Sequence, residues 1–490
     1  MPWIALHLPQ LPLQALLASL PGCEATLPLA VVERHRLVGA SRAARARGVQ
    51  IGQSNATALA LLPTLVVQPR DPAREAAFVE TLALALAALT PRLVLAPSGV
   101  LLEVTSTLRL FGGLRALQRR ALALAQDCNA QVRLACAPTA AAAWLLATSG
   151  SVRRRVLQAA SCTRRLDALP VAAIEALLPL ATAQRELLEA LGVQRLGALR
   201  ALPRAGLQRR FGTALTRVLD RAYGDAPEVH DWFEPPERFA LKRELLQRAD
   251  NAEVLVAATQ ALLPALTGWL QRRWQAATVL VLRLGHERGR EPAPDTLLWL
   301  QLSTPSRDAV QLALLWRERL QRQVLIAPVY EIELLLEAAV PDGGRPGELL
   351  ALPGQGEDER AALLDRLVAR LGPQRVQRWQ PLADHRPERA QHARPVHEAV
   401  LPAPADPAAP PRPAWLLPAP EPLGHDALGR PRHGGDTLRL CSRAERIESG
   451  WFDGALVRRD YHVAEGSDHR LRWVYREHPA GGWFLHGWFG

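Results

Sequence analysis

The sequence predicts an α+β multidomain protein, and three observations lead to this prediction. Strand-like and helix-like segments alternate twice along the chain, and a purely helical pattern separates the two alternating regions. The chain's 490 residues are too many for one hydrophobic core. A turn-rich and then proline-dense stretch precedes an aromatic-rich end. We therefore expect domains at 1–150, 151–232 and 233–340, a linker with a helix at 341–400, a proline-rich tether at 401–424 that holds no packed element, and a module at 425–490.

Residues 1–150 alternate between period-2 apolar strands and helices with one apolar face. A hairpin is expected around His35 and Arg36. One strand, Val100 to Thr105, is entered through Pro97-Ser98-Gly99 and contains a single carboxylate, Glu103. The expected strands are 3–8, 29–33, 37–41, 65–69, 100–105 and 130–138, and the expected helices are 13–20, 56–63, 74–90, 114–128 and 139–148.

The second alternating region predicts a small sheet with helices on one face. Its strands are expected at 277–284, 295–303 and 330–338, and its helix at 307–322. A further helix is expected at 358–371, beyond the turn-rich "PDGGRPG".

The clearest local motif is "LLEALGVQRLGALRALPRAGLQRRFG", residues 187–212, which predicts a helix-hairpin-helix. A turn at Gly192 and Val193, followed by a helix containing Gly197, presents backbone N–H groups to a phosphate without reading base sequence. Arg209 and Arg210 add positive charge nearby. The motif also fits an ordinary helical hairpin capped by glycine.

Charge and cysteine content narrow the class of protein. A net charge of +11 favours a polyanionic partner, with nucleic acid preferred over a membrane, although a merely basic protein also fits. The five cysteines form no CxxC pair, and no histidines have metal-ligand spacing, so neither zinc nor a disulfide framework is supported. No run reaches the roughly 18 apolar residues of a membrane span. We expect a reduced, cytoplasmic protein without a cofactor.

The domain order and three local segments resemble the Y-family translesion DNA polymerases. The segments are "GASRAARARGVQIGQSNATALALLPTLVVQ" (39–68), "VRLACAPTAAAAWLLAT" (132–148) and the strand after Pro97. The resemblance implies a right-hand architecture: a UmuC-like palm and fingers (1–150), a thumb with the helix-hairpin-helix (151–232) and a β-α-β little finger (233–340). It also implies that basic thumb and little-finger surfaces hold primer–template DNA.

The residues that the family uses for chemistry are missing. Two-metal phosphoryl transfer needs carboxylates that hold two ions about 4 Å apart. By resemblance, the first-strand acid falls at His7 or Leu8, and the paired acids fall at Ser98 and Gly99. The nucleotide-stacking aromatic falls at Arg42, its companion arginine is kept as Arg45, and the two palm lysines fall at Ala140 and Trp144.

This pattern indicates a retained fold without polymerase activity and without a metal site. The alternative is an active Y-family polymerase with an atypical metal site that draws on the nearby acids Glu103, Glu33 and Asp71.

The last third resembles the tail of a non-catalytic Y-family branch, the polymerase-like subunit of the bacterial mutasome. The matching segments are 383–390, 415–423, 446–454, 458–464, 472–477 and 482–490. The resemblance implies a hub in SOS-induced mutagenesis that links the replicative sliding clamp, a RecA-like partner of the ImuA type and an error-prone C-family DNA polymerase. It places the clamp peptide at "GELLALPG", with candidate contacts Leu349, Leu350 and Leu352, although Leu349 replaces the usual glutamine and Pro353 the usual aromatic. A linker that packs on its own domain fits equally.

Nine aromatic residues lie between 436 and 490. They suit partner docking, base stacking on single-stranded DNA, or the core of a small β module. The candidate partner-binding residues are Trp451, Phe452, Tyr461, Trp473, Trp483, Phe484, Trp488 and Phe489.

Overall fold

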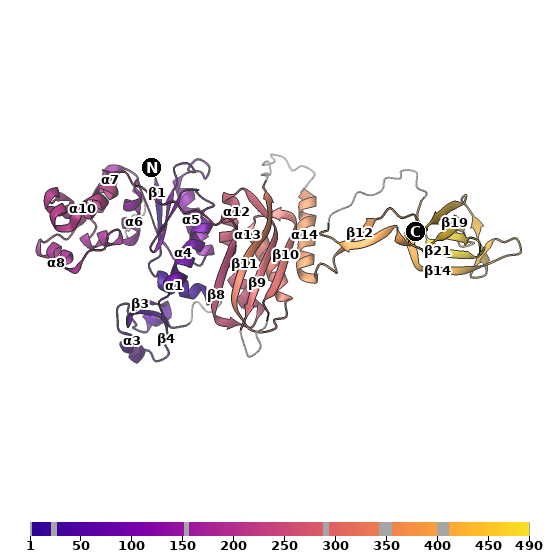
Figure 1. The fold of residues 1–490 in the computed structure, drawn as a ribbon, viewed down its shortest axis with the longest axis horizontal. Coiled ribbons are helices and arrows are strands. Elements are labelled where there is room, and N and C mark those ends of the chain that lie inside the picture. Colours follow the sequence, from indigo (N-terminus) through magenta and orange to yellow (C-terminus); the bar gives the residue numbers. More distant parts are fainter. Residues whose placement is uncertain are drawn as a thin grey trace. The chain divides into compact units, whose positions relative to one another are not determined.

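The chain forms two compact units, Met1–Arg370 and Leu371–Gly490 (Figure 1). The computed structural model describes residues 2–20, 27–150, 156–287, 294–342, 355–398 and 411–489.

The predicted palm is a four-stranded antiparallel sheet in the order β5 (Leu93–Ala96), β6 (Gly99–Glu103), β1 (Trp3–His7) and β7 (Arg133–Ala137). Alternation along β1 sends Ile4 and Leu6 to one face, where they join a core with α1 (Leu11–Ala18), α4 (Pro72–Leu86) and α5 (Leu114–Asp127). Trp3 and Ala5 face the other side and pack with α6 (Ala140–Thr148). The strand predicted at 100–105 is instead the second strand of a hairpin, because the short apolar run before Pro97 also pairs.

The fingers are a small sheet in the order β3 (Arg36–Ala40), β2 (Leu29–Glu33) and β4 (Val66–Pro69), covered by α2 (Arg42–Ala46) and α3 (Asn55–Leu61). The predicted hairpin is present, and its turn places Arg34 and His35 at φ values of 48° and 65°.

Residues 156–223 are helical, as predicted: α7 (Ala159–Asp167), a 3₁₀ segment η1 (Val171–Ala176), α8 (Thr182–Ala190), α9 (Leu196–Ala201) and α10 (Arg204–Tyr223). Leu166, Leu196 and Leu215 belong to the same core as α6 and the outer face of the palm sheet. The thumb is therefore anchored on the palm through α6.

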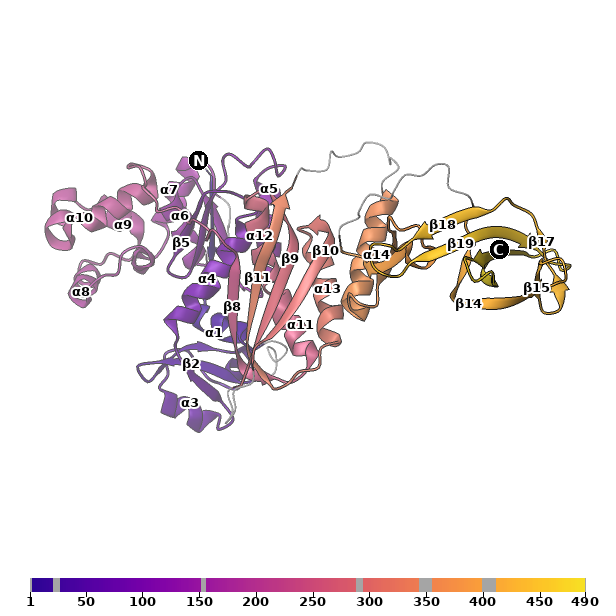
Figure 2. The same ribbon diagram turned by 45° about the vertical axis from the view of Figure 1, so that its right-hand side comes forward.

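The predicted little finger is a sheet in the order β10 (Thr296–Ser306), β9 (Gln275–His286), β11 (Val329–Pro341) and β8 (Ala240–Ala249), with α11 (Ala252–Gln260), α12 (Leu263–Arg272) and α13 (Ala309–Gln321) on one face. α14 (Gln355–Leu371) lies beyond β10, where Asp365 accepts a hydrogen bond from the Ser303 N–H at 2.8 Å (Figure 2). The sequence prediction missed β8, which is largely polar, and the pair α11–α12.

The α11–α12 segment holds the little finger against the palm. At Gly268 a Cβ atom would lie 2.1 Å from the Leu84 carbonyl oxygen, so α12 approaches α4 at a position that only glycine allows. Residues 252–272 are long and apolar enough for a membrane span, but most of this stretch is buried inside the unit, as in a core helix.

The second unit is a β structure whose main sheet includes β14 (Trp415–His425), β21 (Trp483–Trp488), β20 (Leu471–Glu477), β19 (Val457–Glu465) and β18 (Glu445–Ser449), with smaller strands β15 (Pro431–His433), β16 (Asp436–Thr437) and β17 (Arg439–Leu440). A separate hairpin, β12 (Gln377–Pro381) with β13 (Gln391–Pro395), belongs to the same unit. The expectation that 401–424 holds no packed element is wrong from Trp415 onward, because β14 pairs with β21. A register shift between Leu416 and Glu421 accommodates the prolines there.

Arg386 is the main polar cross-link of the second unit. It is 2 % exposed, and its guanidinium donates to Asp384 at 2.7 Å and to both Asp453 carboxylate oxygens at 3.0 and 2.7 Å. The guanidinium also lies over the Phe452 ring, 5.4 Å from its centroid. The hydrogen bonds from Arg386 lower the pKa of the Asp453 carboxyl to about 2. Arg386 thus joins the segment before β13 to the turn between β18 and β19.

We expect Arg386→Met to lower the melting temperature of the second unit more than Arg389→Met, because it leaves two carboxylates without their buried partner, whereas Arg389 is half-exposed. Arg386→Lys should fall between the two, since lysine keeps the charge but loses the planar fork. Calorimetry of the full chain measures this order, and equal losses for Arg386→Met and Arg389→Met would contradict the assigned role.

Candidate functional site

The sheet register brings the predicted acid positions together. His7 on β1 lies directly opposite Gly99 on β6, and the Leu8 N–H donates to the Ser98 carbonyl at 2.8 Å. On its other side His7 faces Arg133 of β7. The Leu8 side chain is 1 % exposed and belongs to the core, whereas His7 is only partly buried.

Gly99 leaves no room for a carboxylate. A Cβ atom at this position would lie 2.0 Å from the Leu6 carbonyl oxygen and 3.1 Å from the His7 Cα. Because both neighbours are backbone atoms, no side-chain rotation relieves the overlap. Any residue with a side chain at position 99 therefore requires β6 to move away from β1.

His7 and Trp144 fill the space beside this strand pair. The ring centroids are 5.5 Å apart and the planes meet at 87°, which is an edge-to-face arrangement. Burial, with a smaller effect of the Arg133 charge, lowers the pKa of the His7 imidazole to about 4. Trp144, at one palm-lysine position, is 3 % exposed and donates from Nε1 to the Ala176 carbonyl at 3.1 Å. At neutral pH a neutral His7 imidazole therefore packs against the Trp144 indole.

The three nearby acids already have structural partners. Glu103 is 2 % exposed and accepts the Thr105 N–H at 2.9 Å. Glu33 pairs with Arg70 at 3.3 Å, and Asp71 caps α4 by accepting the Ala73 and Arg74 N–H groups at 3.0 and 3.1 Å. Across the described ranges, no group of three His, Cys, Asp or Glu side chains has a geometry suited to a metal ion.

The predicted nucleotide-binding positions have two kinds of surroundings: two are exposed arginines, and one lies at a capped helix start. Arg42 and Arg45 lie on α2 and are exposed. Ala140 begins α6, where Glu228 accepts the Ala140 and Ala141 N–H groups at 2.7 and 2.9 Å. The Glu228 carboxylate, which the sequence analysis did not single out, therefore binds the first N–H groups of the helix that carries the two lysine positions.

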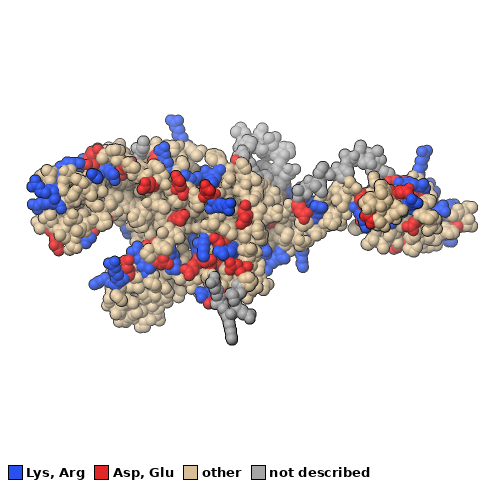
Figure 3. Space-filling view, in the orientation of Figure 1, with Lys and Arg blue, Asp and Glu red and all other residues tan. Residues whose placement is uncertain are grey.

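The helix-hairpin-helix residues have two kinds of surroundings. Gly192 has φ of 67°, and the Val193 N–H returns to the Leu188 carbonyl at 3.0 Å, which closes the end of α8. At Gly197 a Cβ would lie 2.8 Å from the Asp167 Cβ, so this glycine permits α9 to pack on α7. Arg209 and Arg210 are exposed, and among the described residues neither has an ion-pair partner. Lysine and arginine side chains gather at the thumb end of the first unit in Figure 3.

The outer face of the little-finger sheet is not basic, contrary to what the resemblance implied. Arg283 pairs with Glu333 at 2.6 Å, with Asp295 at 3.1 Å and with Glu331 at 3.4 Å. Lys242 also pairs with Glu331, at 2.6 Å. The cations on this face are therefore neutralised by carboxylates.

The aromatic residues of the second unit divide into two groups. Tyr461, Trp473 and Trp483 are 1, 2 and 7 % exposed and belong to its cores, while Phe484, Trp488 and Phe489 are half-buried beside them. Trp451 and Phe452, in the turn after β18, are 72 and 66 % exposed. The clamp-peptide candidates Leu349, Leu350 and Leu352 lie outside the described residues.

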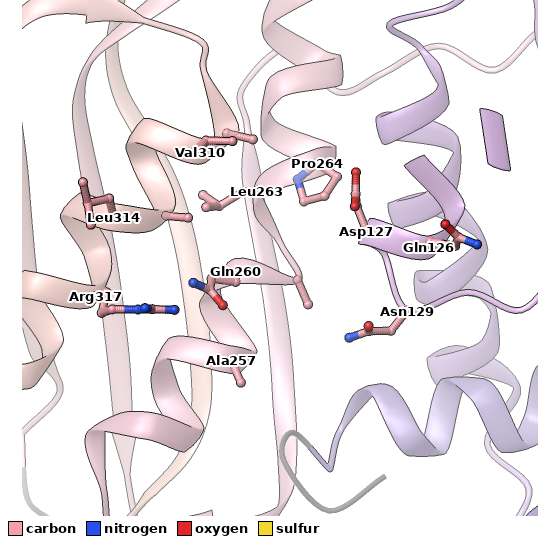
Figure 4. Close-up of a pocket in the computed structure, with 13 residues that line it drawn as sticks. Gln126, Asp127, Asn129, Ala257, Gln260, Leu263, Pro264, Val310, Leu314 and Arg317 are labelled. Atoms are coloured by element: carbon pink, nitrogen blue, oxygen red, sulfur yellow. The ribbon is translucent and has the colours of Figure 1, made fainter. Parts of the chain in front are cut away.

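An open cleft of about 900 Å³ lies between the end of α5 and the helices α11 to α13, away from the residues above. Figure 4 shows Asp127 and Asn129 on one side and Gln260, Leu263 and Arg317 on the other. None of the predicted site residues lines this cleft.

A family model, curated relatives and solved structures all match parts of this chain. The impB/mucB/samB family model matches residues 13–148. Two curated relatives, Protein ImuB from Caulobacter vibrioides strains NA1000 and ATCC 19089, are each 29 % identical over 477 residues, covering 90 % of this chain and all of the relative.

Among solved structures, an insertion ternary complex of Dbh DNA polymerase and DinB from Sulfolobus solfataricus align with TM-scores of 0.39 and 0.37, at 16 and 15 % identity, over 68 and 69 % of this chain and 98 % of each of theirs. The described residues mix helices and sheets and end in a strand-rich module with an aromatic cluster. Over most of its length, the chain is similar to the curated ImuB proteins.

We predict that Gly99→Ala destabilises the palm by about 1–3 kcal/mol, the usual cost of forcing extra atoms into a packed site. Gly206→Ala is the matched control, because no atom lies within 4 Å of a Cβ at that helical position. Urea unfolding followed in the first unit measures both. A Gly99→Ala protein as stable as the control would show that β6 has room to move.

We also predict that His7 makes the first unit less stable as pH falls from 6.5 towards 4. The unfolded imidazole takes up a proton over this range, whereas the folded one, with its pKa lowered to about 4, does not. His7→Leu should flatten this part of the curve of melting temperature against pH. Identical curves for wild type and His7→Leu would refute a buried neutral His7.

Proposed function

We propose that the protein is a non-catalytic Y-family homologue that acts as a DNA-binding scaffold in SOS-induced translesion synthesis. The observation that carries this proposal is the packing at the paired ends of β1 and β6. There, Gly99 faces His7 with no room for a carboxylate, and the neutral imidazole packs on Trp144. Two-metal phosphoryl transfer depends on concentrated negative charge at this place. The side chains at positions 7, 99 and 144 supply none of this charge.

DNA binding is proposed mainly for the thumb. The exposed arginines Arg209 and Arg210 beside the helix-hairpin-helix are free to contact phosphates, and such contacts are independent of sequence. The neutralised face of the little finger makes that sheet a weaker candidate for phosphate contacts. A net charge of +11 is consistent with a polyanionic partner.

The proposed partners are the sliding clamp, a RecA-like protein of the ImuA type and an error-prone C-family DNA polymerase, which would perform the synthesis in the cytoplasm. Trp451 and Phe452 are the strongest docking candidates in the second unit, because their rings are exposed while Arg386 and Asp453 fix the turn that carries them. Tethering a polymerase to DNA through such a scaffold raises its effective concentration at a stalled terminus.

The alternative function is an active Y-family polymerase with an atypical metal site. It would have to use Glu103, Glu33 or Asp71, and each of these carboxylates is held by an arginine or by backbone N–H groups. Recruiting any of them would cost the contacts it now makes.

Primer extension by the purified full chain with Mg²⁺ separates these functions. We expect no nucleotide incorporation, because His7 and Gly99 provide no carboxylates to hold two Mg²⁺ ions. The same preparation should bind primer–template DNA, with affinity falling steeply as salt rises. Arg209→Gln/Arg210→Gln should lower the slope of log Kd against log salt by about 1–2. Incorporation that disappears in a Glu103→Gln protein would favour the alternative, and salt-independent binding would remove the scaffold role.

A further inference from the structure

A second cationic feature lies where the thumb meets the palm. A cleft of about 770 Å³ opens between the start of α5 and the length of α7. One α5 residue lines it together with two residues before α7, the N-cap of α7, three residues of that helix and its C-cap: Arg115, Val156, Leu157, Gln158, Ser161, Arg164, Arg165 and Ala168.

Three guanidinium groups converge on this cleft without a counter-charge. No carboxylate occurs among the described lining residues, and Arg115, Arg164 and Arg165 have no ion-pair partner in the described ranges. Arg164 reaches only the Ser161 hydroxyl, at 3.4 Å. Elsewhere in the thumb, by contrast, Arg185 pairs with Glu175 at 2.8 Å and Arg200 with Asp225 at 3.2 Å.

Helix electrostatics explain only part of this arrangement. Arg164 and Arg165 lie in the last turn of α7, where the helix dipole favours cations. Arg115, however, is the second residue of α5, and a cation in the first turn is disfavoured by the same effect. An arginine at the unfavourable end of one helix, beside two more from another helix, makes this cleft a positively charged site.

We propose that this cleft binds a phosphate group. Arginine is suited to this because its planar fork donates two parallel hydrogen bonds to phosphate oxygens. Ser161 and Gln158 add neutral donors on the same wall. The phosphate belongs either to a nucleic-acid backbone, in which case the inference rests on the proposed function and adds a contact separate from Arg209 and Arg210, or to a free pyrophosphate-like anion.

The test compares Arg115→Gln/Arg165→Gln with Arg217→Gln/Arg221→Gln in the full chain. The control pair removes the same charge from exposed thumb positions outside the cleft. One arm measures primer–template affinity over a salt series, and the other measures the rise in melting temperature caused by pyrophosphate. Arg115→Lys/Arg165→Lys, which keeps the charge but loses the fork, checks that any effect reflects bidentate binding.

We expect the cleft variant to lower the slope of log Kd against log salt by about 1–2 beyond the control, which identifies a backbone phosphate. Loss of the pyrophosphate effect alone identifies a free anion as the ligand. If the cleft and control variants match in both arms, the proposal is wrong. If the wild-type chain binds no DNA, the scaffold function fails, while the pyrophosphate arm still decides the role of the cleft.

Discussion

The close approach of β6 to β1 at Gly99 determines what the palm is able to hold. Because the Leu6 carbonyl oxygen lies where a Cβ atom of residue 99 would be, this pairing of β6 with β1 requires glycine at that position. Beside this strand pair, Trp144 packs edge-to-face on His7, and burial lowers the pKa of the His7 imidazole. Several carboxylates at the paired ends of β1 and β6 would oppose this packing, since like charges in a poorly solvated site repel strongly. The missing acids and the tight strand contact are therefore mutually dependent, and replacing one residue with aspartate would not rebuild an ion-binding cleft.

The same packing has consequences for the thumb. The palm face that carries Trp144 continues without interruption into the core of α7, α9 and α10, so the thumb helices are positioned by the filled palm. The exposed arginines of the thumb are consequently held on a rigid support. Meanwhile the little finger packs on α4 at Gly268, and its outer charges are satisfied internally. Arg209 and Arg210 of the thumb differ in this respect from Lys242 and Arg283 of the little finger, which have carboxylate partners.

Much of the fold was predictable from the sequence, because it depends on apolar periodicity that local residues display. The strands at 3–8 and 29–41 and the helical region after 156 are examples. Three features depend on distant contacts and gave no local signal. β14 contains prolines and becomes a strand only through its partner β21, β8 is mostly polar, and α12 is fixed by a glycine contact with α4. At the site, the alignment of His7 with Gly99 followed from resemblance, whereas the Leu6 overlap and the Trp144 contact required coordinates.

The second unit shows why an aromatic-rich segment cannot be assigned to a single role from composition. A ring that is buried in a core cluster, as Tyr461 and Trp473 are, stabilises the module and is unavailable to a partner. Trp451 and Phe452 contribute little burial to the module, yet their turn is held by a buried arginine with two carboxylate partners. Fixing an exposed aromatic turn costs conformational entropy that its own packing does not recover. The cost is offset if the rings are anchors for another macromolecule, because an anchor that is already ordered loses less entropy on binding.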